Sequence, residues 1–121
     1  MPIRAVPMIH VLDVRATAEW YSSVLGFRVV DLAEPDGEGV WAMLSFGDSF
    51  VMFSEGGKPS SAHRREVDLY VYVDDVDALH ARIKDRVEIF EDLHDTFYGM
   101  REFIIRDPNR FWITFGHPLT R

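Results

Sequence analysis

The residues of this sequence best suited to chemistry are a histidine and a carboxylate that stand in apolar strands. His10 lies within "PMIHVLD", and Asp68 begins "DLYVYV". His10 could act as a general base or hydrogen-bond a ligand, or it could lie half in solvent at a strand end. The other histidines lack an H-x-x-x-H spacing, so no separate zinc site is predicted.

Asp68 has aromatic neighbours, because Tyr70 and Tyr72 follow it at alternate positions. A carboxylate on an aromatic surface needs a partner, or its pKa rises. A cationic ligand could be that partner, held by charge and by a cation–π contact worth about 0.5–2 kcal/mol. An internal arginine, Arg64 or Arg101, is an equally good interpretation, and the sequence leaves both open.

Composition excludes several other classes of function. The 121 residues contain no cysteine, which excludes disulfides, thiolate nucleophiles and Cys-ligated zinc. Thirteen basic and twenty acidic residues give a net charge of −7 without a basic stripe, so nucleic acid is not an expected partner. The apolar runs are shorter than the ~20 residues of a membrane helix, and no secretory signal is visible. We therefore expect a cytoplasmic protein that has no membrane partner.

Hydrophobic periodicity predicts that the sequence contains one order of elements twice: a strand, a helix and three strands. The first copy has strands at 3–13, 28–34, 40–46 and 49–55 and a helix at 14–27. The second copy has strands at 66–74 and 87–93, a closing hairpin at 100–117 and a helix at 75–85. This order predicts one α+β domain, 1–121, whose two β-α-β-β-β modules, 1–57 and 65–121, are joined by a linker at 58–64.

A constant offset of 62 residues supports the repeat. Asp13 and Asp75 each precede a helix at this offset, and the same offset places Met52 on Thr114. Unrelated strands would rarely keep both the pattern and the spacing. The closing hairpin is therefore interpreted as the second copy of the hairpin at 40–55.

Alternation along the strands assigns each residue to one side of its sheet. The aliphatic positions should pack under the helices, which leaves a mixed aromatic, methionine and polar set on the opposite face. Such a face is typical of a ligand surface, and the alternative is that a second module or subunit covers it. Beside Val6 and Met8, the residues assigned to ligand binding are His10, Phe50, Met52, Asp68, Tyr70, Tyr72, Trp112 and Thr114. Trp41 and Phe103, which the offset equates, extend this lining if their strands face inward.

Three segments, "VLDVRATAEWYSSVLGF", "VYVDDVDALHARI" and "YGMREFIIRDPNRFWITF", together resemble the vicinal oxygen chelate superfamily. This superfamily includes glyoxalase, the bleomycin-resistance proteins and extradiol dioxygenases, and the resemblance covers nearly the whole chain. It implies paired modules that curl into a U-shaped, mostly antiparallel mixed sheet around a cavity, with the helices on the convex face. It also implies a homodimer, in which modules are sometimes exchanged between chains.

Metal-dependent members of the superfamily carry four ligands on the concave face. The resemblance puts Val6, Met52, Asp68 and Thr114 at those positions. Valine cannot ligate, a thioether suits hard divalent ions poorly, and one carboxylate with one hydroxyl leaves too few donors. We therefore expect no metal or other cofactor. A second departure is Arg110, where the family's turn often has glycine, so this turn either differs or holds arginine at a positive φ.

The sequence therefore favours a metal-free protein of the bleomycin-resistance type, and thus a link to antibiotic resistance. It would sequester a small aromatic compound that could carry a positive charge, rather than act as an enzyme. The alternative is a metal-dependent lyase, isomerase or dioxygenase with shifted ligands, namely His10, Asp68 and either Glu55 or His117. A third interpretation is a structural or regulatory module whose cavity is filled by its own side chains.

Overall fold

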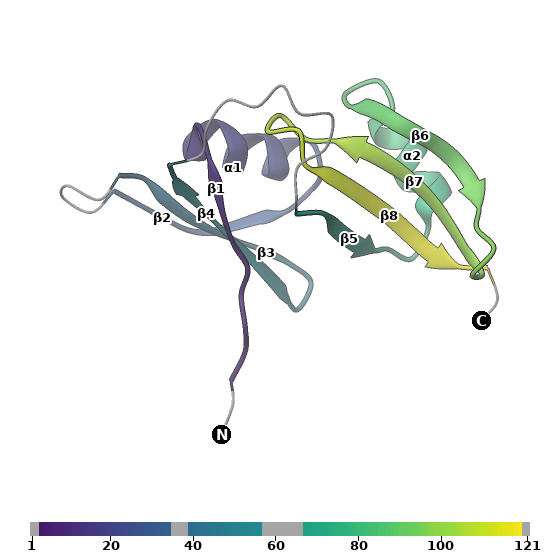
Figure 1. Ribbon diagram of the computed structural model, residues 1–121, viewed down its shortest axis with the longest axis horizontal. Helices are drawn as coiled ribbons and strands as arrows, with labels where there is room; N and C mark the ends of the chain where they lie inside the picture. The colour runs from purple at the N-terminus through teal and green to yellow at the C-terminus, as the bar shows by residue number, and fades with distance from the viewer. Residues whose placement is uncertain (1–2, 35–38, 57–66, 120–121) are drawn as a thin grey trace. The chain divides into compact units, whose positions relative to one another are not determined.

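The computed structural model describes residues 3–34, 39–56 and 67–119. The chain divides into two compact units, Met1–Pro59 and Ser60–Arg121. Each unit consists of one helix and one four-stranded mixed sheet, which confirms the predicted α+β class with β-α-β-β-β order (Figure 1). The U-shaped closure around a cavity stays a prediction, and the proposed linker at 58–64 lies outside the described residues.

Unit 1 forms a sheet with the strand order β1-β4-β3-β2. Its elements in chain order are β1 (Met8–Val11), α1 (Val14–Ser23), β2 (Arg28–Ala33), β3 (Trp41–Phe46) and β4 (Ser49–Glu55). Strand β1 runs parallel to β4, whereas the other neighbours are antiparallel. The first strand is shorter than predicted because Pro7, which has no N–H to give to a ladder, stands directly before it.

Unit 2 repeats this arrangement with the strand order β5-β8-β7-β6. Its elements in chain order are β5 (Leu69–Tyr72), α2 (Val76–Ile83), β6 (Glu88–Asp95), β7 (Met100–Arg106) and β8 (Trp112–Pro118). Strand β5 is parallel to β8, and the remaining neighbours are antiparallel. All the predicted strands and helices therefore exist, with shifts at their ends.

Both helices begin at an aspartate. The carboxylate of Asp13 accepts a hydrogen bond from the N–H of Ala16, and that of Asp75 accepts one from the N–H of Ala78, each at 3.0 Å. Such an N-cap is worth ~1 kcal/mol, and it fixes where the chain turns from strand to helix. Of the described helices, neither has the length and apolar character that crossing a membrane requires.

In each unit the helix covers one side of its own sheet (Figure 1). In unit 1 the ring of Tyr21 on α1 packs on Phe53 of β4, with ring centroids 4.9 Å apart. In unit 2 Ile83 of α2 is fully buried on the same side as the stacked rings of Phe103 and Phe115. We call the opposite side the helix-free face. In unit 1 it carries Met8, His10, Trp41, Met43, Phe50, Met52 and Ser54, and in unit 2 Tyr70, Tyr72, Glu102, Ile104, Arg106, Trp112 and Thr114.

The two hairpins that the offset equated differ by one residue. Ser45 pairs with Phe50 across the first turn, and Arg106 pairs with Trp112 across the second. Arg106 therefore lies 61 residues after Ser45, whereas Trp112 lies 62 residues after Phe50. A constant offset of 62 is thus wrong for β7. Because side chains alternate along a strand, this one-residue shift moves every β7 side chain to the other side of the sheet.

The longer turn is built around Asp107, whose side chain is buried. Its Oδ1 accepts hydrogen bonds from the N–H groups of Asn109 and Phe111, both at 2.8 Å. Arg110 has a φ of 68°, so the arginine occupies the left-handed conformation that glycine adopts more easily. Of the two possibilities for Arg110, the positive φ is confirmed.

Candidate functional site

The helix-free face of unit 1 brings together the predicted residues of that unit. Across the sheet, Met8 lies beside Met52, and Met52 lies beside Met43. In the next row, Ser54 lies between His10 and Trp41. Trp41 therefore faces the side for which it was predicted. The face is an apolar surface of methionine and aromatic side chains with one histidine at its edge.

His10 and Phe50 already have partners within the chain. Nδ1 of His10 lies 2.8 Å from Oγ of Ser54, and the histidine itself is exposed. The guanidinium of Arg4 lies over the ring of Phe50, 4.1 Å from its centroid. This contact shows a ring of the face in the position to accept a cation.

Phe103 is a correction to the predicted site. Its side chain is 0% exposed and lies on the helix side of the sheet in unit 2, stacked on Phe115. The ring of His80 on α2 meets it edge-on, with centroids 5.1 Å apart. The one-residue register shift of β7 is the physical reason, and the residue that takes the position corresponding to Trp41 is Glu102.

Glu102 is a functional candidate that the sequence reasoning missed. It is only 2% exposed, yet each oxygen of its carboxylate accepts one phenol hydrogen bond. Tyr70 donates to Oε2 at 2.6 Å, and Tyr98 donates to Oε1 at 2.7 Å. We call these three residues the Tyr–Glu–Tyr triad. The signal that could have found Glu102 is the additional residue in the second turn, because it places an acidic residue on the aromatic face.

Gly116 makes room for the triad. In the sheet it lies between Tyr72 and Glu102, and Tyr70 belongs to the neighbouring row. A Cβ at Gly116 would collide with the Tyr70 hydroxyl and would lie 3.2 Å from Cγ of Glu102. The absence of a side chain here is what lets the Tyr70 hydroxyl reach the carboxylate.

The triad raises the pKa of both of its phenols. Burial, then the hydrogen bond to Glu102 and the negative charge of Glu102, raise the pKa of Tyr70 well above its ordinary value. The hydrogen bond to Glu102 is also the main reason that the pKa of Tyr98 is raised. Both hydroxyls are therefore protonated near neutral pH, and both protons point at Glu102.

Other aromatic rings continue this surface on both sides of the triad. The rings of Tyr70 and Tyr72 lie with centroids 4.8 Å apart, and those of Phe90 and Trp112 lie 4.2 Å apart. Tyr72 is 71% exposed, so its ring is open to solvent. The helix-free face of unit 2 therefore combines open aromatic rings with a buried carboxylate.

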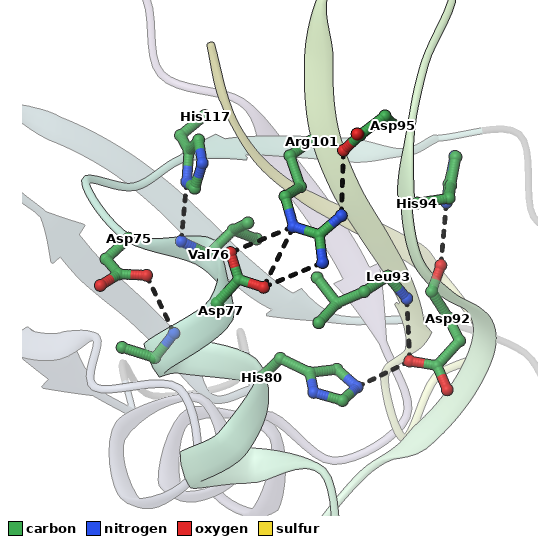
Figure 2. A network of polar contacts seen from close by, with 11 residues as sticks. Asp75, Val76, Asp77, His80, Asp92, Leu93, His94, Asp95, Arg101 and His117 are labelled. Carbon is green, nitrogen blue, oxygen red and sulfur yellow. Dashed lines mark hydrogen bonds and ion pairs between the residues drawn. The ribbon is translucent and has the colours of Figure 1, made fainter. Parts of the chain in front are cut away.

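Asp68 directly precedes β5 and is exposed. Arg101, one of the two arginines considered as its partner, instead binds Asp77 and Asp95 on the helix side of the sheet (Figure 2). The other, Arg64, lies outside the described residues. Arg101 is thus engaged with Asp77 and Asp95, and the pairing of Asp68 with an internal arginine or with a ligand stays a prediction.

Two of the alternative metal ligands also face away from the helix-free surfaces. Nδ1 of His117 accepts a hydrogen bond from the N–H of Val76 at 2.9 Å, so this ring is held at the start of α2 (Figure 2). Glu55 pairs with the buried Val11, so it alternates to the other side of the sheet from His10. Neither Glu55 nor His117 therefore lies on the helix-free face of its own unit.

The positions of the superfamily's metal ligands do not suit a metal in this chain. Val6 lies before β1, Met52 pairs with Met8, and Thr114 pairs with Tyr70. Together with Asp68 they offer one carboxylate, one hydroxyl and one thioether, which is too poor a donor set for a hard divalent ion. Within 3–34, 39–56 and 67–119, no group of three or more histidine, aspartate or glutamate side chains is arranged to hold a metal.

Comparison with known proteins agrees with this architecture. A family model described as the Glyoxalase/Bleomycin resistance protein/Dioxygenase superfamily matches residues 5–115. A search of curated proteins finds no match.

Several solved structures share the fold. The bleomycin-binding protein from Streptomyces verticillus, in complex with copper(II)-bleomycin, has 25% identity and a TM-score of 0.70, with 95% of each chain covered. TnmS3, an antibiotic-binding protein from Streptomyces sp. CB03234, has 23% identity and a TM-score of 0.75, with 98% of each chain covered. The fosfomycin resistance protein FosX from Listeria monocytogenes has 14% identity and a TM-score of 0.74, covering 96% of this chain and 93% of its own.

Proposed function

The chain belongs to the glyoxalase/bleomycin resistance protein/dioxygenase superfamily, and we propose that it binds and sequesters a small aromatic compound without changing it chemically. Binding would lower the free concentration of the compound by mass action. No metal and no bond-making step is needed. The observation that carries the proposal is the aromatic character of the helix-free faces.

These faces are suited to stacking rather than to metal chemistry. The exposed ring of Tyr72, with Tyr70 beside it, and the separate Phe90–Trp112 pair offer surfaces on which a planar ligand can stack. Each aromatic pair adds about 0.5–1.5 kcal/mol beyond its buried area. The poor donor set at the superfamily's metal positions favours binding over catalysis.

A positive charge on the ligand would suit the protein. The net charge of −7 attracts cations over distances of about a Debye length, ~8 Å at physiological salt. The bleomycin-binding and antibiotic-binding proteins among the structural neighbours support a role in binding such compounds. The class of ligand we propose is therefore an aromatic compound carrying a positive charge.

Intrinsic tryptophan fluorescence tests the proposal, because Trp41 and Trp112 lie on helix-free faces and Trp20 lies on α1. A panel of aromatic cations that includes glycopeptide antibiotics should contain a compound that quenches the emission saturably and is recovered unchanged. The Trp20→Phe variant should keep this quenching, and it should be lost in Trp41→Phe or in Trp112→Phe.

Two results would contradict the proposal. Absence of quenching by every member of the panel would favour a module filled by its own side chains. A stoichiometric divalent ion in protein purified without chelator, lost in Asp68→Ala, would instead indicate a metal-dependent member of the superfamily.

A further inference from the structure

We propose that the Tyr–Glu–Tyr triad (Tyr70, Glu102 and Tyr98) binds a protonated nitrogen group of the ligand, such as an ammonium or amidinium, through the two phenol oxygens. This inference rests on the proposed function, because it names the group that the bound aromatic compound must carry. It assigns specificity to residues that lie outside the superfamily's metal positions.

The direction of the hydrogen bonds carries the inference. A phenol has one proton to donate, and both phenols of the triad donate that proton to Glu102, at 2.6 and 2.7 Å. Each phenol oxygen then has only lone pairs left to offer to a third group, and at Tyr98 the side chain of Thr96 already uses part of them. A ligand at the triad must therefore bring the hydrogen-bond donors itself.

The charge of the triad selects a cation over a neutral donor. Glu102 is too deeply buried for direct contact with a ligand, whereas Tyr70 is 41% and Tyr98 56% exposed. The phenols therefore connect the buried charge to the surface, since hydrogen bonds in a chain polarise one another. A cation at the phenol oxygens would gain both the hydrogen bonds and the attraction of the carboxylate.

The basic side chains near the triad face carboxylates of their own. His94, the cross-strand neighbour of Glu102 on β6, has Nε2 3.4 Å from Glu91 and Nδ1 2.8 Å from the carbonyl oxygen of Asp92. Arg106, further along β7, forms an ion pair with Glu88 at 3.0 Å. In the part of the chain that the structure describes, neither of these basic groups binds Glu102, so its charge is available to a ligand through the phenols.

The geometry also predicts which groups are rejected. An anion would face the lone pairs of the two phenol oxygens and the negative charge of Glu102 behind them. Both repel it, so it should bind poorly. A quaternary ammonium has charge but no N–H, so it could use only the open ring of Tyr72 and the overall field. The order of affinity should therefore be primary ammonium, then trimethylammonium, then carboxylate.

Three probes, each with one phenyl ring, separate the effect of N–H donors from the effect of charge on the wild-type protein. 2-Phenylethylamine carries an ammonium, N,N,N-trimethyl-2-phenylethylammonium carries charge without N–H, and 3-phenylpropionate carries a carboxylate. Chemical-shift titration by NMR gives the dissociation constant of each, including weak ones in the millimolar range. We expect 2-phenylethylamine to bind roughly tenfold more tightly than the trimethyl probe, as for the loss of a charged hydrogen bond.

Single-residue variants then place the effect on the triad. Tyr70→Phe and Tyr98→Phe each remove one phenol oxygen and should each weaken 2-phenylethylamine about tenfold, while 3-phenylpropionate is not weakened. Asp48→Asn is the control, because it changes an exposed carboxylate in the β3–β4 turn, outside the proposed site, and should leave the affinity unchanged. Glu102→Gln removes the charge and should reduce the preference for ammonium over carboxylate.

The possible results distinguish this inference from the proposed function. The inference is wrong if all three probes bind the wild-type protein equally. It is also wrong if Tyr70→Phe and Tyr98→Phe both bind 2-phenylethylamine as tightly as wild type does. In either case the triad does not bind a cation, but the proposed binding of an aromatic compound is not contradicted. If no probe shifts any resonance, and the antibiotic panel also fails, both the inference and the proposed function are wrong. If no probe binds but an antibiotic of the panel quenches the tryptophan emission, Tyr70→Phe and Tyr98→Phe should both bind that antibiotic more weakly than wild type. If they bind it as tightly as wild type, the inference about the triad is wrong and the proposed function is not contradicted.

Discussion

Glu102 shows how one residue can set the chemistry of a sheet face. A buried carboxylate is costly unless its oxygens are hydrogen-bonded, and here each oxygen receives one phenol proton. The same bonds hold the two phenols in one orientation. Gly116 completes the arrangement, because any side chain there would occupy the place of the Tyr70 hydroxyl.

The raised pKa values of Tyr70 and Tyr98 can be measured. Tyr70 and Tyr98 should ionise at a pH above the ordinary value of 10.0 in an absorbance titration of tyrosinate. Because the folded pKa of Tyr70 lies above the ordinary 10.0, its contribution to stability is full below pH 10.0 and is lost as the pH rises through the folded value. Glu102→Gln should bring both late ionisations to lower pH, although burial should still keep that of Tyr70 raised.

Tyr70→Phe and Tyr98→Phe are the controls for this titration, since each should remove one late ionisation and leave the other. Identical titration curves for wild type and Glu102→Gln would contradict the hydrogen bonds of the triad.

The side of the sheet that a residue faces could be predicted from the sequence where alternation along the strand was enough to decide it. His10, Met52 and Thr114 belong to strands whose register follows from the parallel β1–β4 and β5–β8 pairs, and these pairs obey the offset of 62. Glu102 and Phe103 exchange sides because of one residue in a turn. Alternation gives the period of a strand, but a turn of unknown length sets its phase.

At the scale of elements, the β7–β8 turn decides the composition of the site. Its buried Asp107 accepts two backbone N–H groups, and this turn tolerates Arg110 at a positive φ. A residue other than glycine in the left-handed region costs about 1–2 kcal/mol, and asparagine tolerates that region better than most. The turn therefore carries strain that a substitution can relieve.

Arg110→Asn should stabilise the protein relative to Arg110→Ala by about 0.5–1 kcal/mol, because both variants lose the arginine side chain but only asparagine suits the positive φ. The free energy of unfolding in urea measures the difference. Equal stability of the two variants would show that residue 110 does not hold the left-handed conformation in solution.

The start of α2 is anchored to its sheet by charged groups. Arg101 of β7 binds both Asp77 on α2 and Asp95 on β6, and His80 of α2 contacts Asp92 at 2.7 Å (Figure 2). Hydrogen bonds from Arg101 hold the pKa of Asp77 below its ordinary value, and the N–H of Leu93, followed by His80, does the same for Asp92.

These lowered pKa values predict acid sensitivity. A carboxylate with a lowered folded pKa contributes stability that is present above its ordinary value of 3.8 and is lost as the pH falls through the folded value. Unfolding in urea between about pH 5 and about pH 2 should show this loss in wild type, with a shallower slope in Asp77→Asn. Asp48→Asn, which changes an exposed carboxylate in the β3–β4 turn, should keep the wild-type slope.

The elements themselves were largely readable from the sequence, because their signals are local. Asp13 and Asp75 act as the expected N-caps, and β4 has the predicted bounds, Ser49–Glu55. The helices were predicted a few residues too long at their ends, since apolar residues such as Leu25 continue into the loop and remain buried there. Burial extends past a helix end, so periodicity alone does not mark that end.

At the scale of the whole molecule, the repeat leaves one helix-free face on each unit. Large side chains on these faces remain open to solvent, among them Met8, Tyr70 and Tyr72. Exposed apolar patches of this kind commonly mark interaction surfaces. The superfamily resemblance implied a homodimer, and such a partner would cover part of this surface.

We therefore expect two chains to associate in solution. Light scattering coupled to size-exclusion chromatography should give a mass twice that of the 14.0 kDa chain, and the chain unfolded in urea should give 14.0 kDa as the internal reference. Burial of apolar surface, at about 25 cal/mol per Å², would supply the driving force, so the association should persist at high salt. A native mass of 14.0 kDa at every concentration tested would contradict the dimer. In that case a single chain would have to bind the ligand on its aromatic faces.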